Sequence, residues 1–177
     1  MRRFLLLSLL GLLSAAVRAE NWVLNASTLT YHVTHRLHKV EGTSHASRGK
    51  GVCDAGGCQF LVAAPVNSFD SGDTNRDLHM IETTRGATFP MVKVSVTLPA
   101  APNGESFAAD LGVEFSGNSH SYKAVPFTVS SRANGVLSFK GVIPLNVDDF
   151  KIPKPSLLGM AIKAEVPIDV DMTWSKR

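Results

Sequence analysis

The sequence predicts an all-β protein, an antiparallel barrel of eight strands with one short helix. The first observation behind this prediction is the alternation of apolar and polar residues from Ala161 to Trp174. Successive side chains of a strand point to opposite sides of a sheet, so this segment is expected to be a long strand with one apolar face. Such a face needs a long apolar partner surface, which a closed barrel or a sandwich supplies.

The second observation is that seven further strand-like segments precede this one. Turn-forming residues divide them, among them Asn103-Gly104 and Asn134-Gly135. Because Asn-Gly supplies the positive φ angles of tight hairpin turns, both dipeptides predict antiparallel connections. The predicted strands cover residues 22–35, 40–52, 58–66, 91–98, 106–115, 122–131, 136–147 and 161–174.

Two segments interrupt this series of strands. Thr74-Asn75-Arg76-Asp77 has the spacing of a capping box, and Leu78 and Ile81 follow at helical spacing. We therefore expect a short helix near residues 74–83, lying on the barrel wall or across its mouth. Residues 148–159 contain two prolines and are expected to form a long loop before the last strand.

The N-terminus has the features of a secretory signal peptide. Arg2 and Arg3 precede an apolar run over residues 4–13, and small residues follow at positions that a signal peptidase recognises. We expect residues 1–19 to be removed after Ala19, with cleavage after Ala16 as the alternative, and residues 20–177 to form one domain. The apolar run is shorter than the roughly 20 residues that span a bilayer, which disfavours a membrane anchor.

Removal of this segment changes the charge of the protein. The full chain has 18 basic and 15 acidic residues, and three of the arginines lie within the first nineteen residues. The remaining domain is therefore close to neutral. Its charge gives no reason to expect a nucleic acid or an anionic membrane as a partner.

Cys53 and Cys58 are the two cysteines of the chain. They enclose the turn-forming stretch Asp54-Ala55-Gly56-Gly57, so in an oxidising compartment they are placed to form a disulfide across a hairpin. Free thiols are the first alternative. A zinc site would need two more ligands, and haem attachment would need a C-x-x-C pair followed by histidine, so metal or redox roles are disfavoured.

The alternation predicts which side chains face the interior of the barrel. An apolar wall suits a packed core and a hollow lipid site equally well, so both interpretations stay open at this point. The predicted inward residues are Leu29, Tyr31, Val33, Val94, Val96, Leu111, Val113, Phe115, Val125, Phe127, Val129, Leu137, Phe139, Ile162, Val166, Ile168 and Val170.

Several motifs follow one another in order through most of the predicted domain. They are Ser27-x-Leu29-x-Tyr31-x-Val33-x-His35 with Val40-Glu41-Gly42, Pro65-Val66-Asn67-Ser68-Phe69-x-Ser71-Gly72, Asn75-Arg76-Asp77-x-His79-Met80, Phe89-Pro90 and Asp149-Phe150. In this order they resemble the YceI-like family of exported, lipocalin-like polyisoprenoid-binding proteins. The resemblance implies a lipocalin-like eight-stranded barrel in the periplasm, with an elongated pore that holds a polyisoprenoid, a quinone tail or a fatty-acyl chain.

The chain departs from the family pattern at two places. It has Gly117-Asn118-Ser119-His120 where the family has a His-Gly-Val-Thr-like stretch, and the cysteine pair is not part of the common pattern. Neither departure alters the expected fold. The identity of the lipid does not follow from the resemblance, because pore positions accept many apolar residues.

The hollow interpretation defines a candidate binding site. Arg76 and His79, with His35 from the end of the first strand, are candidates for contact with a lipid head group, and Arg76 suits a phosphate or carboxylate. Arg76 and Asp77 could equally hold the helix to the neighbouring backbone: this structural role is favoured for Asp77, and for Arg76 and His79 both roles stay open. The expected lipid contacts are Leu29, Tyr31, Val33, Val94, Val113, Phe115, Phe127, Val129, Phe139, Ile162, Val166 and Ile168.

Catalysis has less support in the sequence. Histidines recur at positions 32, 35, 38 and 45, but a strand sends His32 and His35 to opposite faces, so no metal site and no cofactor are predicted. The pairs Ser44-His45 and Ser119-His120 lack a nucleophile-elbow context. A lipid-binding protein for storage or transport is the first hypothesis. The alternatives are an accessory protein that delivers a quinone-like ligand to a membrane redox partner and, last, an unrecognised hydrolase.

Overall fold

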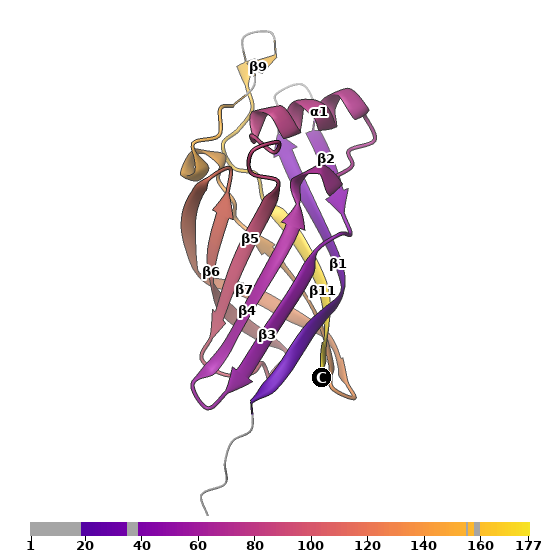
Figure 1. Ribbon diagram of the computed structural model, residues 1–177, viewed down its shortest axis with the longest axis vertical. Helices are drawn as coiled ribbons and strands as arrows, with labels where there is room; N and C mark the ends of the chain where they lie inside the picture. Colours follow the sequence, from indigo (N-terminus) through magenta and orange to yellow (C-terminus); the bar gives the residue numbers. More distant parts are fainter. Residues whose placement is uncertain (1–18, 35–38, 155, 158–159) are drawn as a thin grey trace, which may run out of the picture.

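The computed structural model describes residues 19–34, 39–154, 156–157 and 160–177. In this part of the chain the strands form a closed antiparallel barrel, and helix α1 (Thr74–Thr83) lies across one end (Figure 1). The predicted fold class, an eight-stranded barrel with a short helix at residues 74–83, is confirmed. Apart from Ala19, the predicted signal peptide lies outside the described residues.

The barrel is built from nine of the eleven strands of the structure. The barrel strands are β1 (Glu20–Thr34), β2 (Lys39–Ser44), β3 (Arg48–Asp54), β4 (Gly57–Pro65), β5 (Met91–Leu98), β6 (Ser106–Phe115), β7 (Asn118–Ala133), β8 (Val136–Ile143) and β11 (Ile168–Lys176). The remaining elements are the small hairpin β9 (Ser156–Leu157) with β10 (Met160–Ala161), and the 3-10 helices η1 (Val66–Ser68) and η2 (Val147–Phe150).

The nine strands occupy eight places because β2 and β3 share one of them. The predicted strand over residues 40–52 is divided at residues 45–47, and both parts pair with β1. β2 pairs with the second half of β1 and β3 pairs with its first residues. Between these two stretches, β1 has a bulge after Leu24 in its pairing with β11, and such a bulge bends a strand. The pairing of β1 with β11 then closes the barrel.

The last strand is shorter than the alternation predicted. The ladder with β8 begins at Ile168, immediately after Pro167, which has no N–H to donate. The preceding residues are nevertheless held between two neighbours, because Lys163 donates to the carbonyl of Thr34 at 3.0 Å and Val166 to that of Leu145 at 2.8 Å. The alternation therefore predicted the direction of these side chains correctly and the extent of the strand incorrectly.

Only one of the two Asn-Gly dipeptides forms the tight turn that the sequence predicted. Asn134-Gly135 forms the predicted tight turn, with φ of 50° and 75°, between β7 and β8. Asn103-Gly104 does not, because residues 99–105 form a longer, proline-containing connection between β5 and β6. Ser116-Gly117 forms a tight turn that was not predicted, with φ of 50° and 74°, and it lets β7 begin at Asn118.

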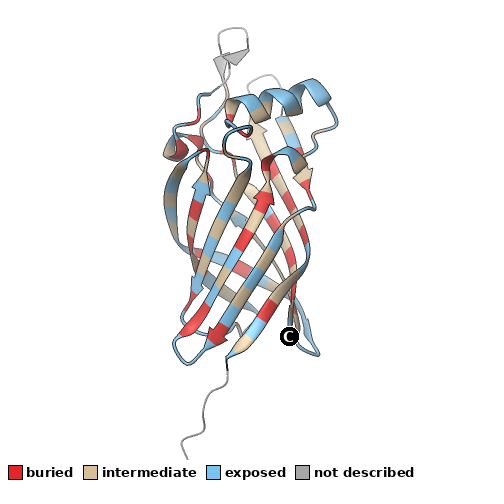
Figure 2. Cartoon of the chain, viewed as in Figure 1, coloured by how far each residue is buried: buried red, intermediate tan, exposed pale blue. Residues whose placement is uncertain are grey.

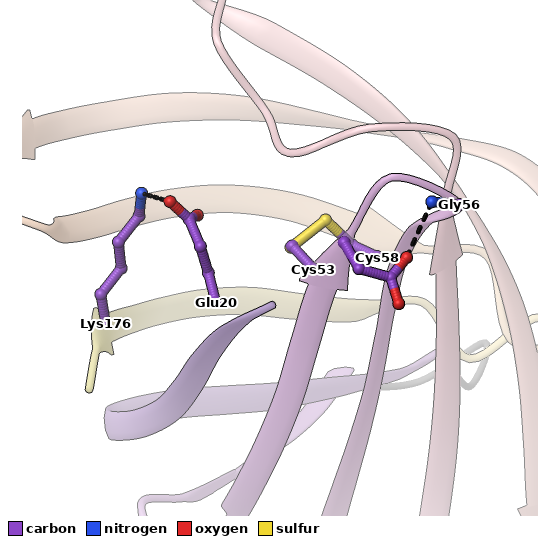
Figure 3. Close-up of a disulfide and its surroundings, with 6 residues drawn as sticks. Glu20, Cys53, Gly56, Cys58 and Lys176 are labelled. Carbon is purple, nitrogen blue, oxygen red and sulfur yellow. Dashed lines mark hydrogen bonds and ion pairs between the residues drawn. A yellow bond between two sulfur atoms is a disulfide. The ribbon is translucent and has the colours of Figure 1, made fainter. Parts of the chain in front are cut away.

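The predicted disulfide is present at one end of the barrel. Cys53 and Cys58 face each other across the β3–β4 hairpin and are joined by an S–S bond (Figure 3). Within the turn, the Gly56 N–H donates to the Asp54 carboxylate at 2.8 Å. Nearby, an ion pair of 2.6 Å between Glu20 and Lys176 joins the beginning of β1 to the end of β11 (Figure 3).

Burial follows the alternation of the strands (Figure 2). Helix α1 has no buried residue, and Leu78, predicted to belong to its apolar side, is 54% exposed. The capping residue also differs from the prediction, because the N-cap is Asp73, whose carboxylate accepts from the Arg76 N–H at 3.1 Å. The helix thus covers the end of the barrel with the side that contains Arg76, His79 and Met80.

Candidate functional site

The interior of the barrel contains an apolar cavity of about 500 Å³. Its wall comes from every barrel strand except β3, and from η1, α1, η2 and the segment before β11. Within the described part of the chain, no carboxylate lines this wall, and the basic side chains that do are Arg76 and His79. The apolar wall and the confinement of charge to one helix favour a ligand with an apolar body.

Most of the predicted contact residues lie on this wall. Val129 does not: it packs against the core beside the cavity, at a register shift in the pairing of β7 with β8. His35 lies outside the described residues. The predicted contacts that line the cavity are Leu29, Tyr31, Val33, Val94, Val113, Phe115, Phe127, Phe139, Ile162, Val166 and Ile168, with Arg76 and His79 at the helix.

The other residues predicted to face inward also divide into those that line the cavity and those that do not. Val125 is buried but does not line the cavity, whereas Val96, Leu111, Leu137 and Val170 do. Sequence reasoning missed part of the wall on β4, where Phe60, Val62 and Ala64 alternate and would have supplied the signal. It also missed residues outside the ladder, for which no periodicity exists. Examples are Phe69, Val147, Ile152 and Pro153.

Aromatic residues gather toward the disulfide end of the cavity. Trp22 and Trp174 are 7% and 3% exposed, and the Phe60 ring packs edge-on against Trp174 with 5.0 Å between centroids. Phe107 stacks on Phe127 at 5.3 Å. Phe139 packs edge-on against both rings, with centroid distances of 5.1 and 5.4 Å. We call Trp22, Phe60 and Trp174 the aromatic floor of the cavity.

Glycines on nearby strands give several of these rings their positions. Phe60 lies directly over Gly51, its cross-strand partner, and Trp174 over Gly49, where an added Cβ would be 2.5 Å from the indole. Phe127 lies over Gly141 in the same way. Because glycine has no side chain, each ring can occupy the space that a Cβ at these positions would take.

A hydrogen-bond network holds the start of α1 at the opposite end. The Asp77 carboxylate accepts from the Ser71 backbone N–H at 3.1 Å and from its hydroxyl at 2.6 Å. Arg76 donates through Nε to the Ser71 hydroxyl at 2.9 Å and through Nη2 to its carbonyl at 2.8 Å. Asp77 contacts the chain before the helix and does not line the cavity, whereas Arg76 does both.

Tyr31 lies beside this network, with its ring over Gly42. Burial raises the pKa of the Tyr31 hydroxyl above its ordinary value of 10.0, and the negative charge of Asp77 raises it further, against smaller opposing effects of Ser71 and Arg76. The phenol therefore stays neutral near pH 7. It adds a polar but uncharged group to the wall near α1.

A second polar cluster fixes η2 at the mouth. The Tyr122 hydroxyl donates to the Asp149 carboxylate at 3.1 Å, and His120 lies 3.5 Å from the same carboxylate. Burial, with the Asp149 contact, raises the pKa of Tyr122 to about 12, although the hydrogen bond from the Asn146 N–H opposes this shift. The cluster holds Phe150, which is fully buried, against the barrel wall.

The described residues contain no group of three or more His, Cys, Asp or Glu placed to hold a metal ion. His32 points to the outer surface, where it contacts Glu41 and Asp169 through its two ring nitrogens. Within the same residues, no helix has both the length and the apolar composition needed to cross a membrane.

The fold and the apolar cavity define a small lipocalin-like barrel, and comparison with known families agrees. A family model described as the YceI-like domain matches residues 22–174, so this chain belongs to the YceI-like family. A comparison with curated protein sequences finds no match.

Several solved structures share the fold. BcnA from Burkholderia cenocepacia is 18% identical, with a TM-score of 0.70 over 83% of this chain and 95% of that chain. A polyisoprenoid-binding domain from Saccharophagus degradans, implicated in plant cell wall breakdown, is 17% identical, with a TM-score of 0.67 over 88% and 98%. A YceI protein from Campylobacter jejuni is 12% identical, with a TM-score of 0.65 over 81% and 88%.

Proposed function

We propose that this chain is an exported binding protein that holds the apolar chain of one lipid inside the barrel, for storage or transport. The candidate ligands are a polyisoprenoid, the tail of a quinone and a fatty-acyl chain. The observation that carries the proposal is the apolar cavity of about 500 Å³, whose wall includes no carboxylate among the described residues. An empty cavity of this size forfeits packing contacts that an apolar ligand would supply.

The comparisons support a binding role. The chain belongs to the YceI-like family, and the related domain from S. degradans is described as polyisoprenoid-binding. Both point to a binding protein rather than an enzyme. The apolar wall agrees with this direction, and the polar groups Ser71, Arg76 and Asp77 at its end hold the start of helix α1 in place.

Arg76 and His79 mark the end of the cavity at which a polar head group would lie. Arg76 contacts the Ser71 hydroxyl and carbonyl, and it has no ion pair with any described carboxylate. A guanidinium in this position suits a phosphate or carboxylate of the lipid. We propose that the apolar chain of the ligand extends from this end toward the aromatic floor.

Export to the periplasm is part of the same proposal. It is supported by the basic and apolar N-terminal residues and by the disulfide, which is typical of oxidising compartments. A binding protein outside the cytoplasm can carry a lipid between membranes or to a membrane partner.

A pair of neighbouring residues on β4 tests the binding site. Val62 faces the cavity and is 5% exposed, whereas Leu61 faces outward and is 55% exposed. Val62→Glu is expected to reduce binding of a long-chain prenol at least a hundredfold, because an unpaired charge is costly to bury in an apolar cavity. Binding is measured by native mass spectrometry and by displacement of a fluorescent fatty acid.

Leu61→Glu is the matched control and is expected to bind as the parent does. If Val62→Glu fails to fold, Val94→Phe fills the same cavity without adding charge and is expected to lower the binding capacity. Unchanged binding in a folded Val62→Glu or Val94→Phe variant would contradict the proposed site. Separately, mass spectrometry of the organic extract of denatured, purified protein would identify any lipid that the protein carries.

A further inference from the structure

We infer that the outer face of β3, β4 and β5 is a docking surface for an extended, acidic segment of a partner protein that also carries apolar side chains. This surface lies on the outside of the barrel wall, so the inference goes beyond the proposed function. It rests on a shallow groove in this face, on exposed apolar side chains within the groove and on the cations around it.

The groove follows from the pairing of the three strands, which lie side by side (Figure 1). Its floor includes Gly51, which has no side chain. The floor also includes Phe60 and Val96, whose side chains line the cavity inside the barrel, so their backbone faces the groove. Outward side chains form the sides of the groove in two rows across the sheet. One row is Lys50, Leu61 and Ser95, and the other is Val52, Gln59 and Thr97.

Two apolar side chains of this groove remain exposed to solvent. Leu61 is 55% exposed and Val52 is 36% exposed, and they are two of the four large hydrophobic side chains that are exposed among the described residues. They lie on adjacent strands in diagonal positions, close enough for one partner segment to contact both. A partner that covers the groove would therefore remove both from water.

The charges around the groove determine the kind of partner. The stretches that form it, residues 48–52, 59–63 and 93–97, contain three cations and no carboxylate. The cations are Arg48, Lys50 and Lys93. Among the described carboxylates, an ion pair reaches only Lys93, which lies 3.3 Å from Glu114 on β6. This face is therefore basic, although the predicted domain as a whole is close to neutral, and it complements an acidic partner.

An extended acidic segment fits this surface better than other occupants do. A second copy related by a two-fold axis would place the cations of both copies against one another, which is unfavourable. A bilayer surface is flat whereas the groove is concave, and two apolar side chains give little anchoring in a membrane. An extended segment alternates its side chains, so it can place apolar groups over Leu61 and Val52 and carboxylates beside Lys50.

Three short synthetic peptides test the surface by NMR titration of the ¹⁵N-labelled protein. The first carries two leucines between glutamates, the second replaces its leucines with serine, and the third replaces its glutamates with lysine. The first is expected to shift the amide signals of Lys50, Leu61 and Ser95, with a dissociation constant of about 1 mM or lower. The other two are expected to bind at least tenfold more weakly, and added salt should weaken binding of the first. Equal binding of all three, or signals of these residues that the first peptide leaves unshifted, would overturn the inference.

Variants separate this surface from the cavity. Lys50→Glu and Leu61→Glu are each expected to weaken binding of the first peptide at least tenfold and to leave displacement of a fluorescent fatty acid as in the parent. Val62→Glu is expected to do the reverse, so failure of the docking surface and failure of the lipid site are distinguishable. Lys140→Glu is the charge-matched control on β8, which lies four places from β4 in the barrel, and it is expected to bind the peptide as the parent does.

Arg48→Glu serves if Lys50→Glu does not fold. Parent-like peptide binding in the folded variants of Lys50 or Arg48 and of Leu61 would show that this face is not the docking surface. Vesicles of phosphatidylcholine with and without phosphatidylglycerol test the membrane as the occupant. Binding to the anionic vesicles that Lys50→Glu abolishes, with no binding of the first peptide, would assign the face to a membrane and overturn the inference.

Discussion

At the scale of single residues, His32 has the most distinctive electrostatic environment on the outer surface. Its Nδ1 lies 3.0 Å from Glu41 on β2, and its Nε2 lies 2.9 Å from Asp169 on β11, so one imidazole contacts both neighbours of β1. Burial of the ring lowers the pKa of His32, but the hydrogen bonds to Asp169 and Glu41 outweigh this effect. The pKa therefore lies above its ordinary value of 6.5.

The raised pKa predicts that His32 stabilises the barrel at low pH. Its contribution is fully present below the ordinary pKa and is lost as the pH rises through the higher pKa of the folded state. The three side chains are partly exposed, so the contribution is expected to be about 1 kcal/mol or less. Urea unfolding at about pH 5.5 and about pH 9 should show a larger loss of stability with pH in the parent than in His32→Gln.

His45→Gln is the control for this prediction. His45 also lies on the outer surface, but it contacts the Thr28 hydroxyl at 3.1 Å rather than a carboxylate. His45→Gln is expected to leave the difference in unfolding free energy between the two pH values as in the parent. An identical pH dependence in His32→Gln and the parent would contradict the role assigned to His32.

At the scale of elements, the β3–β4 hairpin combines a short turn with a covalent bond. Cys53 and Cys58 are five residues apart, so the closed loop is small and the chain entropy that the disulfide removes from the unfolded state is limited. Replacing both with alanine is expected to cost about 2 kcal/mol and to lower the melting temperature while leaving the fold intact. Thermal unfolding followed by circular dichroism measures the loss, and titration of free thiols in the non-reduced parent would disprove the disulfide.

The sequence predicted an element well where the element depends on its own residues, and poorly where it depends on contacts with distant segments. The faces of β4, β5 and β11 follow from alternation, which needs no knowledge of the partner strand. The start of β11 at Ile168 required the position of β8, and the division of the second strand at residues 45–47 required the separate stretches of β1 with which its two parts pair. A hydrogen bond between Tyr122 and Asp149, which are 27 residues apart, holds the 3-10 helix η2 in place. No local sequence pattern predicts such a contact.

The candidate site was predictable to a similar extent. Inward residues of regular strands were identified by their period, and Phe127 and Ile168 are examples. Val129 was wrongly assigned to the cavity, because no sequence pattern indicates the register shift in β7. The positions of Phe60, Phe127 and Trp174 over glycines of other strands were not predictable, because these contacts depend on which strands lie side by side.

At the scale of the whole molecule, the proposal of export makes a direct prediction about the N-terminus. Cleavage after Ala19 would leave Glu20 as the first residue, and β1 begins at this residue. Intact-mass analysis of protein from the periplasm is expected to give a chain starting at Glu20, or at Val17 if the alternative site is used. Full-length protein recovered from the cytoplasm would contradict export.

The closure of the barrel by β1 and β11 has a consequence for folding. These strands lie at opposite ends of the domain, and the pair Tyr31 with Ile168 joins residues far apart in the sequence. Until β11 is available, β1 and β8 each have an unpaired edge, and the loop that must close is nearly the whole domain. Pairings of such long range make folding slow. If the chain is exported as proposed, it would cross the membrane N-terminus first and stay unfolded until its last strand has emerged, and the barrel would then form on the far side.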